Sequence, residues 1–327
     1  MSTLLVYDVG GTRLRAARWC PEAGLRAVVR RPAPSYRVRP GLDGSGLVEA
    51  LIEEMRDQAE ELGIITPDAV AVGFAGPVDP RGRAWSAPTL WGDRVVGPVD
   101  LPSLLRRAFP GAAVDVVNDV TAAGHRYLRA ADDSLCIVTV SSGIGHKVFV
   151  RGRAAVGPRG RGGELGHLRV DWTADAPRCD CGGRGHLGAV ASGRAVGPVA
   201  ARRARADAVG WRRSALAAVC PDPAALTGEQ LVAHEADPWA RSLLVELATP
   251  LGRALAAVHV DTGVERFVLV GGFALAAGPV WLEGVRAAAR AGAWDTGQDW
   301  STMVELGLPD DDAGLVGLGL RHDRGRA

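Results

Sequence analysis

Two histidines and two cysteines fall within one short, glycine-rich stretch of the chain. His167, Cys179, Cys181 and His186 follow the pattern H-x11-C-x-C-x4-H. Thiolate sulfur and imidazole nitrogen in a set of four are ligands that suit tetrahedral zinc. The alternative is a pair of buried free thiols with two surface histidines, but a polar, glycine-rich segment is a poor place to bury thiols as core. The spacing therefore favours a zinc site.

Three glycine-containing turns could bind anions through backbone N–H groups. DVGGT (residues 8–12) and SSGIG (residues 141–145) each lie between two strand-like segments, and VGGF (residues 270–273) ends a strongly apolar one. Glycine lets the backbone approach a phosphate, and an aspartate that ends a strand can hold Mg²⁺ through water. Each turn alone also fits a plain hairpin, in which Gly-Gly is common. Three such turns in this order favour a nucleotide-binding protein.

Asn118 and Asp119 form a polar pair at the end of one strand-like segment, directly before a helical one. Both residue types are favoured at helix N-caps, and by itself that is the simpler interpretation. The functional interpretation is a carboxylate that accepts a hydroxyl proton during phosphoryl transfer.

Alternating strands and helices must position these residues. The period of apolar residues predicts helices over residues 44–64, 120–131 and 310–322. Strands are predicted over residues 4–8, 13–19, 25–31, 69–79, 113–119, 135–150 and 266–274. Residues 135–150 echo the strand, glycine turn and strand of residues 4–19, which suggests two lobes built on one plan. The chain therefore belongs to the α/β class.

The composition excludes several classes of function. The net charge is +1 with the two signs intermixed, so we expect neither nucleic-acid binding nor attachment to an anionic membrane. The basic segment of residues 201–207 fits a solvated helix face. No window approaches about 18 uninterrupted apolar residues, so no membrane span is expected. Five cysteines, an odd number, argue against a disulfide framework and favour the cytoplasm.

Taken together, these motifs resemble the ROK family of sugar kinases, named for repressor, open reading frame and kinase, over essentially the full length. DVGGT is similar to the first phosphate loop of the family, SSGIG to the second, and VNDVTAA (residues 117–123) to its sugar-and-base motif. GELGH (residues 163–167) followed by CDCGGRGHLGAVASG (residues 179–193) resembles the zinc signature. Family repressors carry a DNA-binding domain before the first phosphate loop, which begins here at residue 8, so DNA binding is not expected.

The resemblance implies an actin-like (ribonuclease H-like) two-domain ATPase fold with a cleft between the domains. It implies a small α/β domain of residues 1–117 plus about 308–322, and a large α/β domain of residues 118–307 with a zinc-binding loop at 164–186. ATP, Mg²⁺ and a structural Zn²⁺ would be bound, and a homodimer is expected. Asp119 would be the general base. The substrate side would include Asn118, Glu164, His167, Thr89 and Gly76, and the ATP side Asp8, Gly10, Gly11, Thr12, Arg13, Ser142, Gly143, Gly271 and Gly272. The zinc ligands would be His167, Cys179, Cys181 and His186, with His167 also facing the sugar.

Departures from the family pattern bear on the substrate. The family has C-x-C-x4-C-x-E, but here His186 replaces the third cysteine and Gly188 replaces the glutamate. Thr89 stands where the family usually has asparagine, and His146-Lys147 replaces the usual Gly-Gly of the second loop. Loss of a charged hydrogen-bond acceptor costs a ligand built to use it about 1.5–3 kcal/mol. We therefore expect phosphorylation of the primary hydroxyl of a glucose-like pseudo-sugar, with a C7-cyclitol such as 2-epi-5-epi-valiolone favoured. An ordinary hexose or N-acetylmannosamine kinase and a non-catalytic sugar-binding regulator are the alternatives.

Overall fold

The chain begins with three antiparallel strands joined by short turns, as the sequence predicts. In the computed structural model, which describes residues 3–95 and 97–325, β1 (Leu4–Val9) pairs with β2 (Arg13–Cys20), and β2 pairs with β3 (Gly24–Pro32). β4 (Ala69–Phe74) and β5 (Ala113–Asn118) extend the sheet in parallel on the other side of β1, in the order β3-β2-β1-β4-β5.

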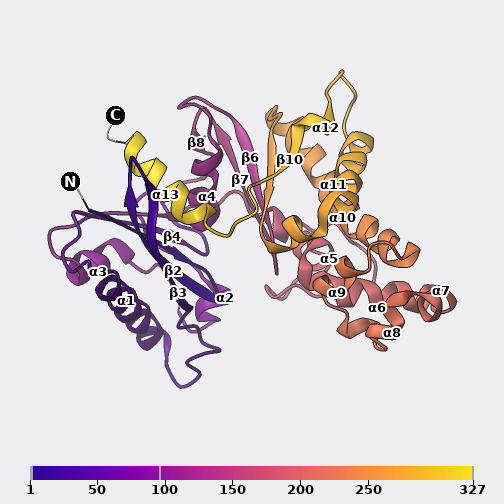
Figure 1. The fold of residues 1–327 in the computed structure, drawn as a ribbon, viewed down its shortest axis with the longest axis horizontal. Coiled ribbons are helices and arrows are strands. Elements are labelled where there is room, and N and C mark those ends of the chain that lie inside the picture. The colour runs from indigo at the N-terminus through magenta and orange to yellow at the C-terminus, as the bar shows by residue number, and fades with distance from the viewer. Residues whose placement is uncertain (1–2, 96, 326–327) are drawn as a thin grey trace. The chain divides into compact units, whose positions relative to one another are not determined.

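Helices cover both faces of this sheet (Figure 1). Successive side chains of a strand point to opposite faces. Leu5, Tyr7 and Val9 accordingly join a core with α1 and α3, whereas Leu4 and Val6 join one with α4 and α13. The helices are α1 (Gly44–Glu61), α2 (Pro88–Trp91), α3 (Leu101–Ala108), α4 (Asp119–Tyr127) and α13 (Ala313–Arg324). The three helices predicted from the sequence are thus confirmed as α1, α4 and α13.

A second sheet repeats the plan of the first. β6 (Leu135–Val140) pairs antiparallel with β7 (Ile144–Val150) and parallel with β9 (Phe267–Val270), just as β1 pairs with β2 and β4. With β8 (Arg153–Ala154) and β10 (Val304–Leu306) its order is β10-β9-β6-β7-β8. The correspondence confirms that the echo in the sequence reflects two sheets of the same construction.

The chain divides into two compact units. Unit 1 contains residues Met1–Asp133, Arg151–Gly162 and Asp312–Ala327, and unit 2 contains Ser134–Val150 and Gly163–Asp311. This division differs from the expected boundary at residue 117. Helix α4 belongs to unit 1 because it packs against α13 and β4, with Ala122 buried beside Leu315 and Leu318. The predicted metal-binding loop, residues 164–186, lies in unit 2.

Unit 2 is mainly helical outside its sheet. One helix, α10 (Pro238–Thr262), is long and apolar enough to cross a membrane by length and composition, which the sequence analysis did not anticipate. More than half of its apolar stretch is buried inside the structure, as in the core helix of a soluble protein.

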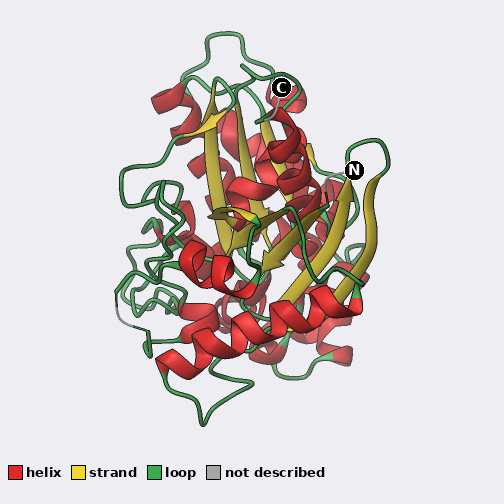
Figure 2. Ribbon diagram, turned by 90° about the vertical axis from the view of Figure 1, so that its left-hand side faces the viewer, coloured by secondary structure: helices red, strands yellow, loops and turns green. Residues whose placement is uncertain are grey.

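Loops take up much of the remaining chain (green in Figure 2). The other helices of unit 2 are η1 (Leu165–His167), α5 (Leu187–Ala191), η2 (Gly193–Ala195), α6 (Val196–Ala206), α7 (Ala208–Arg213), α8 (Ala215–Val219), η3 (Pro223–Ala225), α9 (Gly228–Ala233), α11 (Gly272–Gly292) and α12 (Trp300–Met303).

Candidate functional site

In unit 1, the predicted site residues collect where three parallel strands end. Val9 of β1 is in register with Phe74 of β4, and Phe74 with Asn118 of β5. The loops that follow these strands therefore leave the sheet at the same edge, which is where ligands bind in α/β folds. These loops and α4 carry Gly10 to Thr12, Gly76 and Asp119.

The DVGGT turn is closed by a hydrogen bond from Gly10 N to Arg13 O of 2.9 Å. A Cβ added at Gly11 would overlap the side chain of Thr89. The predicted phosphate loop therefore contacts the predicted substrate residue Thr89, which lies on the short helix α2. Asp8, at the end of β1, is buried, and its Oδ2 is 2.8 Å from Arg15 Nη2.

Asn118 holds three parts of this edge together. Its side-chain oxygen accepts hydrogen bonds from Val120 N and Thr121 N, both at 3.1 Å, and so caps α4. Its Nδ2 donates to Gly76 O at 3.0 Å and to Asp119 Oδ1 at 2.8 Å. An asparagine amide offers two donors and one oxygen with two lone pairs, so these four bonds use its whole capacity. The helix-cap interpretation is thus confirmed, and the same side chain also orients Asp119.

In unit 2, two predicted loops follow neighbouring strands. Ser142 and Gly143 lie in the turn between β6 and β7, and Gly271 and Gly272 follow β9. The backbone at Gly271 has a φ of 98°, a conformation that favours glycine. A Cβ at this position would lie 2.7 Å from Val140 O. Gly272 begins α11, whose N-terminal end carries the positive end of the helix dipole.

An arginine that sequence reasoning missed lies across the second loop. Arg194 Nε donates to Ser142 O at 2.9 Å, and its Nη1 pairs with Asp180, which stands between Cys179 and Cys181. Arg194 thus connects the predicted phosphate loop to the predicted metal-binding loop. No local pattern in the sequence signals this contact, because the three partners are separated by many residues.

The GELGH segment rests on two residues of β7. His146 Nδ1 accepts a hydrogen bond from Leu165 N at 3.0 Å, and Lys147 Nζ lies 3.3 Å from Glu164 Oε1. Burial and the neighbouring Lys147 charge lower the pKa of His146 to about 4, so its imidazole is neutral at pH 7. The sequence analysis treated this pair only as a departure from the family pattern and missed its contacts with GELGH.

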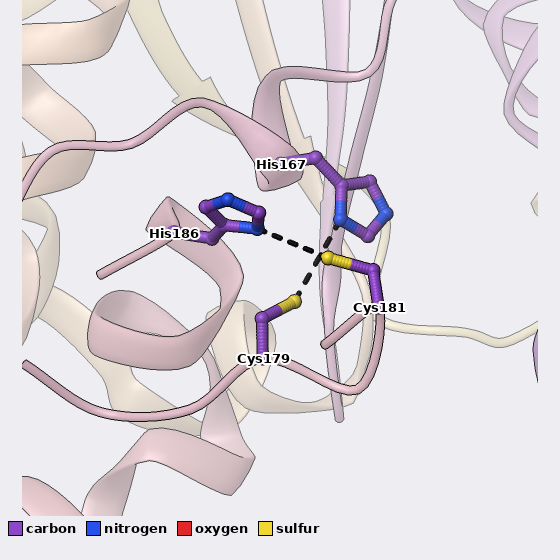
Figure 3. A group of neighbouring side chains, drawn as sticks. All are labelled: His167, Cys179, Cys181 and His186. Carbon is purple, nitrogen blue, oxygen red and sulfur yellow. Dashed lines mark hydrogen bonds between the residues drawn. The ribbon is translucent and has the colours of Figure 1, made fainter. Parts of the chain in front are cut away.

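The four predicted metal ligands come together (Figure 3). Their ligand atoms all lie within 4.8 Å of one another. Cys179 Sγ is 3.7 Å from His167 Nδ1, and Cys181 Sγ is 3.2 Å from His186 Nδ1. With Zn–S near 2.3 Å and Zn–N near 2.0–2.1 Å, a tetrahedral ion places sulfur and nitrogen roughly 3.5 Å apart. The donor set and its spacing therefore fit zinc.

The loop is built to admit these side chains. Cys179 N donates to Gly183 O at 2.8 Å and Gly182 N to Cys179 O at 2.9 Å, which fold the segment back on itself. A Cβ at Gly183 would overlap the His186 ring. Burial raises the pKa of the Cys179 thiol, and burial and the His167 charge lower the pKa of His186. Binding of a cation would oppose the first effect, because the thiolate is the ligand.

Comparison with known proteins places this chain in a family. The model of the ROK family matches residues 5–319. The chain belongs to the ROK family.

Two curated relatives and one solved structure are similar to this chain over nearly its full length. The chain is 39% identical to a C(7)-cyclitol 7-kinase of Streptomyces hygroscopicus subsp. limoneus, covering 97% of this chain and 92% of the relative. It is 34% identical to a 2-epi-5-epi-valiolone 7-kinase of an Actinoplanes species, covering 96% and 91%. The crystal structure of a ROK family glucokinase from Streptomyces griseus, in complex with glucose and AMPPNP, superposes with a TM-score of 0.75 at 24% identity, covering 97% and 98%. The predicted family and actin-like two-domain α/β fold are thus confirmed.

Gly188, which stands where the family pattern has glutamate, lies beside the GELGH segment. A Cβ at Gly188 would be 3.2 Å from Gly166 O and 3.7 Å from Ile144 N. Gly188 therefore stands two residues past the predicted metal ligand His186 and packs against the segment that carries Glu164 and His167. Its position supports the expectation that the change affects a ligand held by that segment.

Proposed function

We propose that this protein transfers the terminal phosphoryl group of ATP to the exocyclic primary hydroxyl, at C7, of a C7-cyclitol such as 2-epi-5-epi-valiolone. The observation that carries this proposal is the identity of 34–39% to two cyclitol 7-kinases over more than nine tenths of each chain. Both relatives are kinases, which agrees with the phosphotransferase reaction predicted from the sequence. Gly188 supports the choice of acceptor, because the missing carboxylate would bind hydroxyls near a sugar's anomeric carbon, and a carbocyclic ring has no anomeric carbon.

In the proposed reaction, Asp119 accepts the proton of the attacking hydroxyl as its oxygen bonds to the γ-phosphorus of ATP. The bond from that phosphorus to the bridging oxygen breaks, and ADP leaves. Asn118 orients Asp119 through its side-chain amide and, as expected from the sequence, also lies on the acceptor side. Glu164, His167, Thr89 and Gly76 belong to the acceptor side.

The glycine loops form the ATP side of this proposal. Backbone N–H groups of Gly11, Thr12, Ser142 and Gly143 contact the phosphates, together with Arg13. The Gly10 N–H closes the turn that shapes this loop. Gly271 and Gly272 line the adenosine. Asp8 lies where it could hold Mg²⁺ through water, with Arg15 fixing one of its oxygens. Mg²⁺ would neutralise charge on the transferred phosphoryl group.

We also assign a structural zinc ion to His167, Cys179, Cys181 and His186, supported by their spacing. Because Nδ1 of His167 faces Cys179, Nε2 is the nitrogen left to face the acceptor. A homodimer, a cytoplasmic location and a place in the biosynthesis of an aminocyclitol antibiotic complete the proposal.

A coupled assay of ADP release tests the acceptor. The acceptors are 2-epi-5-epi-valiolone, glucose, mannose and N-acetylmannosamine, each with ATP and Mg²⁺. We expect the highest kcat/KM for the cyclitol, and mass and NMR spectra of the product that place phosphate on C7. A higher kcat/KM for any hexose would overturn the acceptor. No ADP release with any of the four would contradict the kinase proposal in favour of a non-catalytic regulator.

Asp119→Asn tests the chemistry separately. General bases contribute about 10²–10⁴-fold to rate, so this variant should retain less than about a hundredth of the wild-type kcat. Near-normal ATP binding by calorimetry would show that the fold is preserved. Retention of a larger rate would remove Asp119 from the role of base.

A further inference from the structure

Lys147 is a charged side chain inside the core of unit 2. It lies on β7, and its side chain is only 1% exposed. Removing an ammonium group from water costs several kcal/mol unless an anion compensates for it. A lysine is therefore not retained in such a place without a partner.

One partner of this lysine is Glu164, which stands at the start of η1. Lys147 Nζ is 3.3 Å from Glu164 Oε1, whereas the Glu164 side chain is 43% exposed. The two members of the pair thus differ in burial: the ammonium group is buried in the protein, and the carboxylate is partly exposed to solvent. A ligand can touch Glu164 but not Lys147.

Gly163 provides the space through which the lysine reaches its partner. A Cβ at Gly163 would lie 2.6 Å from Lys147 Cδ and 2.9 Å from Nζ. The hydrogen bond from Leu165 N to His146 Nδ1 fixes the backbone on the other side of Glu164. One residue of β7 therefore holds the backbone of GELGH, and the next holds its carboxylate.

We propose that Lys147 is a positioning residue that sets acceptor specificity through Glu164. It holds one carboxylate oxygen, so that the other is presented in a fixed direction to hydroxyls of the acceptor. It also balances the charge of Glu164, so that this part of the site accepts neutral polyols and does not attract amines. This inference rests on the proposed function for the role of Glu164 toward the acceptor.

Charge balance distinguishes this role from a merely structural one. Without Lys147, Glu164 keeps its negative charge without the buried counter-ion, and an acceptor that carries an ammonium group is attracted to it. Loss of Lys147 should therefore weaken binding of a neutral cyclitol or hexose and improve relative use of its amino analogue. Loss of packing alone would affect both acceptors equally.

Lys147→Met tests this in the full-length protein, with Arg203→Met as a control. Arg203 pairs with Glu246 at 2.9 Å elsewhere in unit 2. The acceptor is whichever of the four above the wild type uses best, compared with an amino analogue: valiolamine for the cyclitol, or glucosamine or mannosamine for a hexose. If the cyclitol is not a substrate, the proposed function is contradicted, but the role of Lys147 can still be tested with a hexose acceptor.

For Lys147→Met we expect the acceptor KM to rise about tenfold or more, since a hydrogen bond to a charged group is lost. The KM for ATP should stay within about twofold, and the ratio of kcat/KM for the amino analogue over the neutral acceptor should rise at least about fivefold. Arg203→Met should change neither KM value nor the ratio. An unchanged acceptor KM, or an unchanged ratio, would overturn the proposal.

Lys147→Gln covers the case in which the methionine variant does not fold. Glutamine keeps a donor for Glu164 but removes the charge. Its acceptor KM should rise less than that of the methionine variant, whereas the preference for the amino analogue should rise to the same extent. A glutamine variant that folds and keeps the wild-type preference would contradict the assigned charge balance.

Discussion

The side-chain nitrogen of Asn118 donates a 2.8 Å hydrogen bond to Oδ1 of Asp119, the neighbouring residue and proposed base. The Asp119 oxygen that accepts this bond also accepts one from Val120 N at 2.8 Å. These donors hold the carboxylate at the first residue of α4, where the helix dipole favours negative charge. The cap of the helix and the orientation of the base are therefore one arrangement.

Asn118→Ser should separate the cap from the orientation. Serine ranks with asparagine as an N-cap, so the cap itself should be kept. Gly76 O loses its donor, so the free energy of unfolding should fall by about 1–3 kcal/mol. Serine also cannot donate to Asp119 as the amide does, so kcat of the folded variant should fall by about tenfold. Chemical denaturation and initial rates measure the two effects. A wild-type kcat in the folded variant would show that Asp119 needs no help from Asn118.

Gly188→Glu should move acceptor preference toward glucose. The new carboxylate would lie beside the GELGH segment and could accept hydrogen bonds from hydroxyls of the acceptor, so the ratio of kcat/KM for glucose over cyclitol should rise about tenfold. The Cβ would be 3.2 Å from Gly166 O, which is tight. Gly188→Ala introduces the same crowding without the charge and is the matched control. A similar shift in both variants would assign the effect to shape and not to the carboxylate.

Metal analysis of the purified protein should give about one zinc per chain. Cys181→Ser should lose it and unfold at a lower temperature, because a structural ion contributes directly to folding. His186→Cys should keep it, since thiolate and imidazole both bind zinc. Cys20→Ser, outside the cluster, should behave as wild type. Well under one zinc per chain in the wild type would contradict the four-ligand site.

Arg194→Ala should raise the KM for ATP by about three- to tenfold and leave the acceptor KM unchanged. Its guanidinium lies against the Ser142 carbonyl, close to where the phosphates are proposed to bind, but its side chain is about half exposed and its effect is reduced by solvent. Asp180→Asn should give a smaller change in the same direction, since Asp180 only orients Arg194. Arg213→Ala, an exposed arginine of α7, serves as control. If Arg194→Ala changed only the acceptor KM, Arg194 would contribute to acceptor binding and not to ATP binding.

Acid should destabilise the protein through two buried histidines. Burial lowers the pKa of His125 to about 4, aided by the charges of Arg321 and Arg324, and burial and Lys147 lower the pKa of His146 to about 4. The unfolded chain takes up protons at these sites below about pH 6.5, whereas the folded protein does so only near pH 4. The free energy of unfolding should therefore fall as pH drops from 6.5 to 4. His146→Gln, which can still accept from Leu165 N, should flatten this dependence in denaturant titrations; an unchanged slope would contradict the neutral, buried imidazole.

Local patterns in the sequence predicted most strands of the two sheets, three helices and the candidate site residues, but not most helices of unit 2. The apolar period over residues 44–64 predicted α1, and the glycine turns at DVGGT and SSGIG predicted the hairpins β1–β2 and β6–β7. The four candidate metal ligands were predicted from spacing, because three of them lie within one short loop, and their side chains lie close together. The shared family and fold followed from these motifs and are confirmed by comparison. The division into compact units differs from the expected boundary at α4, because the apolar pattern of a helix does not state which sheet it packs on.

The amino-acid sequence by itself thus determined which chemical groups this protein has available: a carboxylate at the end of a strand, glycine loops, a Cys/His cluster and a glycine at residue 188. The tertiary structure alone decided which side chains act together. It placed Lys147 beside Glu164, Arg194 across Ser142, and the Asn118 amide on Asp119. The first two are contacts between segments distant in the chain, and all three depend on side-chain directions and on burial. A buried charge, or an amide whose hydrogen bonds are all made, can be recognised only when its neighbours are known. The free energy of burying such a group depends on the protein groups that replace water around it.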